Sequence, residues 1–173
     1  MRILVSFAGL PGVGKTTLAT NLSKHTSAAY FRVDSVETAL RNSAVAIKDP
    51  KDAGYLALAV VAKDNLKLDL DVIVDTVNPL KVTRELWADI AAASNAALLN
   101  VEVICSDQTI HRARIEGRHS DIKGHVLPSW QDVVEREYSQ WDVDRLVIDT
   151  SKVSIDANTA IIAREFYNLK STI

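Results

Sequence analysis

Short apolar runs alternate along the chain with longer stretches of mixed polarity. Runs of this length, rich in Ile, Leu, Val and Ala, are typical of strands that are buried on both faces of a sheet. We therefore expect five strands, over residues 3–8, 30–33, 72–74, 98–104 and 145–148.

Helices are expected between these strands, and several carry start signals. Asp49-Pro50 and Asn78-Pro79 each combine a capping side chain with a proline, which favours the first turn of a helix. Ser129 followed by Asp132 forms a capping-box pattern. The expected helices span residues 14–24, 35–41, 49–68, 78–93, 107–118, 129–140 and 154–169.

The alternation of strands and helices indicates an α/β fold, a three-layer doubly wound parallel sheet with helices on both faces. One domain over residues 1–173 is expected, because the length suits a single domain and no linker or repeat interrupts it. Ligands bind such sheets beyond the carboxyl ends of the strands. Four aspartates fall at or just past those ends: Asp34, Asp75, Asp107 and Asp149.

A glycine-rich segment between the first strand and the first helix matches the phosphate-binding pattern G-x-x-x-x-G-K-[ST] in full. Its glycines let successive backbone N–H groups point into one concavity, and the positive end of the following helix adds to the attraction for phosphate. Lys15 would reach the β- and γ-phosphates, and the Thr16 hydroxyl would ligate Mg²⁺. The expected nucleotide-binding residues here are Gly9, Pro11, Gly12, Val13, Gly14, Lys15, Thr16 and Thr17. The alternative is a glycine turn with an incidental lysine.

Two of the aspartates are candidates for the chemistry. Asp75 ends an apolar strand, which is where a carboxylate that holds Mg²⁺ opposite Thr16 is expected. The alternative is that Asp75 caps the turn before Asn78. Asp34 could accept a proton from a substrate hydroxyl. It could also be a helix N-cap, because Glu37 stands three residues later.

Basic residues gather just before a segment, 117–128, that contains Gly, Pro, His and Ser and is expected to be a loop. Arg114 and Arg118 are four residues apart, so on a helix they would share a face. Guanidinium groups suit phosphate contact and stacking on a base, and the loop could close over a nucleotide as a lid. The alternative is a solvated charged helix. The histidines of this region lack a short zinc-ligand spacing, so a zinc site is not expected.

Composition and charge limit the classes of partner and the location that we expect for this protein. The net charge of −2 gives no global basic field, which makes a nucleic-acid partner unlikely on bulk charge alone. The longest helix-like apolar run, residues 55–62, is well short of a membrane span. One cysteine excludes an intrachain disulfide, and a cytoplasmic location is expected. Oligomeric state has no signature in the sequence.

These residues together resemble the small P-loop kinases of the nucleoside-monophosphate-kinase fold, and most closely a predicted-kinase group labelled as AAA-family ATPases. Relatives include chloramphenicol phosphotransferase, adenylylsulfate kinase, gluconate and shikimate kinases, and polynucleotide kinase modules. The matching stretches are residues 9–16, 32–37, 75–79, 114–118 and 146–150, so the resemblance covers nearly the whole chain.

The resemblance implies a sheet in the order 2-3-1-4-5, ATP with Mg²⁺ as the donor, and usually a hydroxyl as the acceptor. By position, Asp34 matches the acid that contacts or deprotonates the acceptor in several of these kinases. Arg114 matches an arginine that stacks on adenine, and Arg118 matches the lid arginine that stabilises the transferring phosphoryl group. Lys15, Asp34 and Arg118 are therefore the expected catalytic residues.

The expected function is an ATP-dependent kinase acting on a small-molecule hydroxyl. One alternative is a polynucleotide 5′-hydroxyl kinase, which the net charge disfavours because such enzymes need a basic groove for the strand. A second is a nucleotide-binding regulator without transfer activity. The sequence carries no recognisable code for the acceptor.

Overall fold

Five parallel strands form one sheet in the order β2-β3-β1-β4-β5, as the resemblance predicted. The computed structural model describes residues 1–44 and 47–171. The strands are β1 (Arg2–Ala8), β2 (Ala29–Arg32), β3 (Val72–Asp75), β4 (Ala96–Ile104) and β5 (Leu146–Asp149). The doubly wound α/β fold is confirmed.

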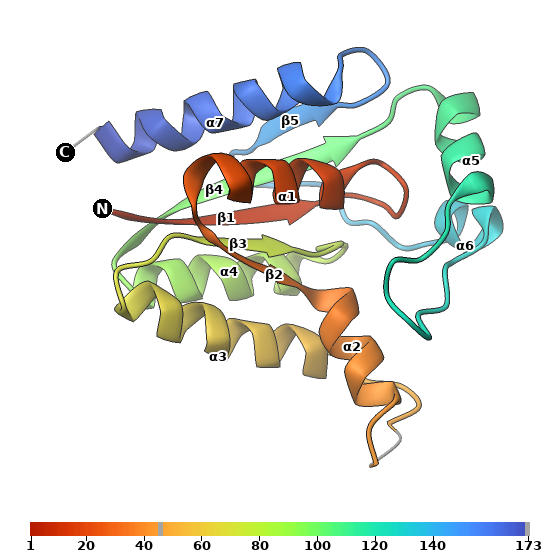
Figure 1. The fold of residues 1–173 in the computed structure, drawn as a ribbon, viewed down its shortest axis with the longest axis horizontal. Helices are drawn as coiled ribbons and strands as arrows, with labels where there is room; N and C mark the ends of the chain where they lie inside the picture. The colour runs from red at the N-terminus through yellow and green to blue at the C-terminus, as the bar shows by residue number, and fades with distance from the viewer. Residues whose placement is uncertain (45–46, 172–173) are drawn as a thin grey trace.

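Helices cover both faces of the sheet (Figure 1). On one face lie α1 (Lys15–Thr26) and α7 (Ile155–Ser171); on the other lie α3 (Ala53–Lys67) and α4 (Lys81–Ala93). Alternate residues of β1 divide between the two cores: Ile3 and Phe7 pack towards α1 and α7, and Leu4 packs with Trp87 of α4. β1 and β3 bury apolar side chains in both layers, and β4 buries them in the layer below α1 and α7. This packing holds the strand ends in fixed register.

Three shorter helices stand at the carboxyl edge of the sheet: α2 (Val33–Arg41), α5 (Gln108–Gly117) and α6 (Trp130–Val134). Figure 1 shows α2 and the connection between α5 and α6 facing each other across the carboxyl ends of the strands. The capping box predicted at Ser129 and Asp132 is present at the start of α6. Among the described residues, no helix is long and apolar enough to cross a membrane.

Two predicted helix starts are wrong, because the residues concerned adopt left-handed backbone. Lys51 has φ 46°, so α3 begins at Ala53 and not at Asp49-Pro50. Asn78 has φ 45°, and α4 begins only at Lys81. A residue in this region cannot belong to a right-handed helix.

The second strand and α6 also depart from their predicted boundaries. β2 ends at Arg32, and Asp34 lies in the first turn of α2 and not at a strand end. α6 ends at Val134, whereas the sequence predicted a helix to residue 140. The segment after α6 is held by tertiary contacts instead, since the carbonyl oxygens of Ser139 and Gln140 accept hydrogen bonds from Arg84.

Asn78 ties β1 to α4 from the centre of the fold. Its amide donates to Ser6 Oγ at 2.9 Å and to the Phe7 carbonyl at 3.0 Å, and its Oδ1 accepts from Trp87 Nε1 at 2.9 Å. The side chain is fully buried. These bonds fix the loop after β3 beside the loop after β1, where the candidate site lies.

Candidate functional site

The phosphate loop has the backbone that its glycines predict. Gly9, Gly12 and Gly14 have φ values of 135°, 81° and 101°, in the region that side chains disfavour. A Cβ added at Gly9 would lie 2.1 Å from the Val103 carbonyl oxygen. The loop therefore requires glycine at these positions and opens directly into α1.

The first turn of α1 faces the site with its backbone donors unused by side chains. Gly14 is the N-cap and makes no side-chain cap, and no acid occupies the first turn. The helix dipole is thus free to attract an anion. Lys15, the first residue of α1, is buried, and its Nζ donates to the Leu10 carbonyl oxygen at 2.9 Å.

Burial lowers the pKa of Lys15 to about 8, although the nearby charges of Asp75 and Asp34 act in the opposite direction. Desolvation disfavours the charged ammonium, so it dominates in this buried position. An anion placed against Lys15 would stabilise the protonated form and raise its pKa again.

Thr16 and Asp75 meet as the sequence predicted. Thr16 Oγ1 donates to Asp75 Oδ2 at 2.7 Å, and Tyr30 of β2 donates its hydroxyl to the same oxygen at 2.8 Å. Asp75 is 3% exposed, and burial raises its pKa, opposed by Lys15 and by the two hydroxyl donors. A hydroxyl and a carboxylate are the hard oxygen ligands that Mg²⁺ prefers, so this pair fits a magnesium ion.

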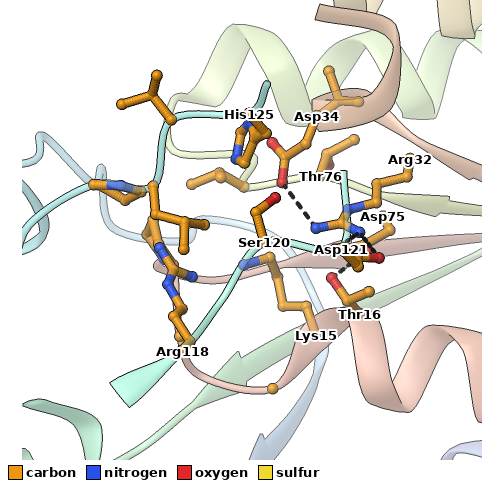
Figure 2. A pocket seen from close by; sticks show the side chains of 18 of the residues that line it. Lys15, Thr16, Arg32, Asp34, Asp75, Thr76, Arg118, Ser120, Asp121 and His125 are labelled. Carbon is orange, nitrogen blue, oxygen red and sulfur yellow. Dashed lines mark hydrogen bonds and ion pairs between the residues drawn. The ribbon is translucent and has the colours of Figure 1, made fainter. Parts of the chain in front are cut away.

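Asp34 lies on the opposite side of the same rim, in the first turn of α2. The N-cap of α2 is Arg32, and no side chain caps this helix, so the alternative interpretation of Asp34 as a helix N-cap is wrong. Its side chain is 36% exposed, and Asp34 Oδ2 lies 3.6 Å from Arg32 Nη2. A single strand, β3, separates β2 from β1, which puts Asp34 and Lys15 on facing sides of one opening (Figure 2).

The two arginines of the α5 region do not share a helix face. α5 ends at Gly117, and Arg118 follows it with extended backbone. Arg114 donates to Thr150 Oγ1 at 2.7 Å and to the Thr150 carbonyl at 3.0 Å, beside the loop after β5. The exposed pair on this helix is Arg112 with Glu116. Arg114 is therefore not part of a solvated charged surface.

Arg118 points into the opening with unpaired donors. Its Nε and Nη2 atoms are buried and have no hydrogen-bond partner among the described residues. Burial lowers the pKa of the Arg118 guanidinium, and the charge of Asp34 acts against this. A buried cation with unused donors is costly unless an anion meets it.

His111 supports the phosphate loop from α5. Its Nε2 lies 2.7 Å from the Pro11 carbonyl oxygen, and its ring meets Trp130 edge-on at 5.2 Å. The described residues contain no group of three His, Cys, Asp or Glu that could hold a metal ion.

One cavity of about 1560 Å³ joins these features. It extends from the phosphate loop and Arg114 to α2, and the 117–128 segment forms part of its wall. Seven Lys or Arg side chains and five Asp or Glu side chains line it, in a chain whose net charge is −2. The cavity therefore carries an excess of positive charge that favours anionic contents.

Sequence reasoning missed four residues of this cavity region: Tyr30, Arg32, Asp121 and Arg136. Tyr30 and Arg32 are on β2, where Tyr30 contacts Asp75 and Arg32 contacts Asp34. The alternation of residues along a strand does not predict either contact. Arg136 influences the pKa of Lys15 from beyond α6. The one available signal was the position of Arg32, at a strand end two residues before Asp34.

The sequence matches one protein family and is similar to two proteins named as kinases. The sequence model of the AAA domain family matches residues 4–137. A protein named adenylyl-sulfate kinase from Aeropyrum pernix is 24% identical over 165 residues, covering 92% of this chain and 90% of the relative. A cytidylate kinase from Desulfurococcus amylolyticus is 24% identical over 183 residues, covering 99% and 92%.

A solved structure gives the same picture of the fold. The APS kinase of Mycobacterium tuberculosis, in complex with AMPPNP and APS, has a TM-score of 0.65 at 20% identity. The match covers 99% of this chain and 98% of that chain. At this identity the likeness establishes the fold.

Proposed function

The chain belongs to this AAA-domain family, in agreement with its resemblance to small P-loop kinases, and on that premise we propose an ATP-dependent kinase that phosphorylates a hydroxyl of a small molecule. One observation carries the proposal. A single cavity has Lys15, Thr16 and Asp75 at one end and Asp34 at the other. That arrangement can hold a triphosphate and an acceptor face to face.

The nucleotide would lie on the phosphate loop and the start of α1. The backbone of Gly9, Pro11, Gly12, Val13 and Gly14, with Lys15, Thr16 and Thr17, would bind the phosphates. Arg114 would border the base from its fixed position on Thr150. Mg²⁺ would be held by Thr16 and Asp75 and would neutralise phosphate charge when bound.

In the transfer step, the acceptor oxygen forms a bond to the γ-phosphorus, and the bond from that phosphorus to the β–γ bridging oxygen breaks, leaving ADP. Asp34 accepts the hydroxyl proton or orients it towards the phosphoryl group. Lys15 and Arg118 stabilise the charge that develops on the transferred group and on the leaving oxygen. Because the transition state is loose, positioning by Asp34 contributes as much as proton removal.

The relatives support a kinase but differ in acceptor, and a cytidylate kinase acts on a nucleotide. The hydroxyl acceptor is therefore the part of the proposal that most needs testing. The 117–128 segment, with Arg118 at its start, would act as the lid that closes over the reacting groups.

The decisive experiment is a screen of metabolites with ATP and Mg²⁺ that detects both ADP formation and a product heavier by one phosphate. Lys15→Ala is the matched inactive control. A product that appears with the native chain and not with Lys15→Ala supports the proposal. Tight ATP binding without any phosphorylated product across acceptor classes would favour a nucleotide-binding regulator.

A further inference from the structure

The carboxylate of Asp75 accepts hydrogen bonds from two hydroxyl groups, and both reach the same oxygen. Thr16 Oγ1 donates to Asp75 Oδ2 at 2.7 Å (Figure 2), and the Tyr30 hydroxyl donates to Oδ2 at 2.8 Å. A carboxylate oxygen offers about two lone-pair sites, so these two donors fill Oδ2. Neither of them occupies Oδ1. A metal ion, or a water molecule bound to it, would therefore meet Asp75 at Oδ1.

The second of these donors comes from outside the phosphate loop. Tyr30 lies on β2, an edge strand of the sheet. In the pairing of β2 with β3, the residue opposite Asp75 is Arg32, but its guanidinium pairs with carboxylates other than Asp75. Tyr30 therefore provides the hydrogen bond from β2 to Asp75.

Packing of the Tyr30 ring fixes the place of its hydroxyl. The ring is half-buried and packs against the apolar core beneath α1 and α7. A tyrosine side chain has only two torsions, so a packed ring leaves the hydroxyl little freedom. Asp75 is 3% exposed, which keeps bulk water from replacing this donor. The carboxylate is thus held between α1, through Thr16, and β2, through Tyr30.

Two donors constrain Asp75 in a way that one cannot. The torsion that turns the carboxylate of an aspartate has a broad energy profile, so a single hydrogen bond to one oxygen leaves the direction of the other oxygen poorly defined. Donors on two different elements, α1 and β2, define it. Groups that hydrogen-bond a metal ligand in this way typically change metal affinity by about 10–100-fold.

We propose that Tyr30 is a positioning residue of the magnesium site, which together with Thr16 fixes Asp75 Oδ2 and so directs Oδ1 towards the metal. The assignment rests on the proposed function, because it concerns the Mg²⁺ that Thr16 and Asp75 would hold. Tyr30 acts through Asp75 and is not itself a ligand.

The test measures how much Mg²⁺ strengthens nucleotide binding, and it needs no turnover. Calorimetry gives the Kd for AMPPNP, a non-hydrolysable ATP analogue, once with Mg²⁺ and once with EDTA, and the ratio of the two values is the contribution of the metal. Tyr30→Phe keeps the ring and removes the hydroxyl. It should reduce this ratio about tenfold and leave the Kd in EDTA unchanged.

Tyr167→Phe is the matched control. It also removes one hydroxyl, which donates from α7 to the His25 carbonyl oxygen at 3.1 Å, away from the cavity. This variant should have the native Kd in both conditions.

A double variant shows whether Tyr30 acts through Asp75. Asp75→Asn should lower the ratio by itself, because an amide oxygen is uncharged and holds Mg²⁺ less well than a carboxylate. Adding Tyr30→Phe to Asp75→Asn should then have no further effect, because the group that Tyr30 positions no longer holds the metal. A native ratio in Tyr30→Phe, effects that add in the double variant, or equal affinity of the native protein with Mg²⁺ and with EDTA would each overturn the inference.

Failure of this inference is distinguishable from failure of the proposed function. A reduced Mg²⁺ contribution in Tyr30→Phe, in a protein that forms no phosphorylated product, would keep the metal site and refute the kinase. A phosphorylated product together with a native Mg²⁺ contribution in Tyr30→Phe would keep the kinase and refute the role of Tyr30.

Discussion

The lowered pKa of Lys15 predicts that the protein takes up a proton when it binds ATP. With a pKa of about 8, half of the Lys15 side chains are neutral at pH 8 before binding. Phosphate oxygens placed against Nζ favour the charged form and return the pKa towards its ordinary value near 10.5. The expected uptake on binding is therefore about 0.1 proton at pH 7, about 0.5 at pH 8 and about 0.9 at pH 9.

Calorimetry measures this uptake directly. Mg²⁺–ATP is titrated without acceptor in two buffers that differ in ionisation enthalpy, and the difference in observed heat gives the protons bound. Phosphate groups, with a second pKa near 6, contribute little above pH 8. Because protonation and binding are linked, the apparent Kd for ATP should also rise about tenfold between pH 7 and pH 9.

Lys15→Arg is the control, because arginine keeps its charge throughout this range. The variant should show no pH-dependent uptake near pH 8. An uptake that persists in Lys15→Arg belongs to another group, and a native protein with no uptake at pH 9 would refute the assigned burial effect.

The lowered pKa of Lys15 also determines how its contribution to folding stability depends on pH. Unfolded Lys15 binds more protons than folded Lys15 between about pH 8 and pH 10.5, so its contribution to stability rises with pH there.

Four substitutions test the rest of the site and the scaffold. Asp34→Asn should reduce turnover about 10²–10⁴-fold with ATP affinity unchanged, measured by initial rates and calorimetry. Arg118→Ala should lower kcat more than it raises the KM for ATP, because its partner charge is largest in the transition state. Asp75→Asn should move the Mg²⁺ titration of activity to higher concentration. Asn78→Ala should destabilise the fold by about 3–5 kcal/mol in urea unfolding, since three buried hydrogen bonds are lost.

Each of these expectations has an outcome that contradicts it. Native turnover in Asp34→Asn with the true acceptor would remove Asp34 from the chemistry. Arg118→Ala that behaves like Arg112→Ala, an exposed-surface control, would make the lid assignment wrong. An unchanged Mg²⁺ requirement in Asp75→Asn would leave Asp75 a purely structural acceptor. If Asn78→Ala unfolds at the same urea concentration as the native protein, the three buried hydrogen bonds of Asn78 contribute nothing to stability.

The nucleotide half of the site could be predicted because it is local in sequence. The phosphate loop lies on consecutive residues, and its glycines dictate the backbone whatever surrounds them. The strand order followed from the family resemblance, and the burial of β1 and β3 followed from their apolar runs. Asp75 could also be predicted from a local signal, because it is the acid that ends a buried apolar strand.

Prediction failed where tertiary contacts overrode local signals. Asn78-Pro79 carries a helix start signal, yet the Asn78 side chain is needed between Ser6 and Trp87, and its backbone turns left-handed. The capping pattern at Asp34 was likewise misleading, because β2 ends one residue earlier than predicted and α2 begins directly at Val33, with Arg32 as its N-cap. Neither outcome can be derived from the local residues alone.

The part of the cavity that we propose holds the acceptor, called here its acceptor half, explains why the sequence carries no recognisable signal for the identity of the acceptor. It is assembled from segments far apart in the chain: Arg32 and Asp34 at the β2–α2 junction, Asp121 in the 117–128 segment, and Arg136 after α6. The contact between Arg32 and Asp121 spans 89 positions and depends on the fold of everything between them. Substitutions in any one of these segments change the charge facing the acceptor without disturbing the phosphate loop. A shared nucleotide half with different acceptor halves is therefore what this architecture permits, and relatives at 24% identity with different named acceptors are consistent with it.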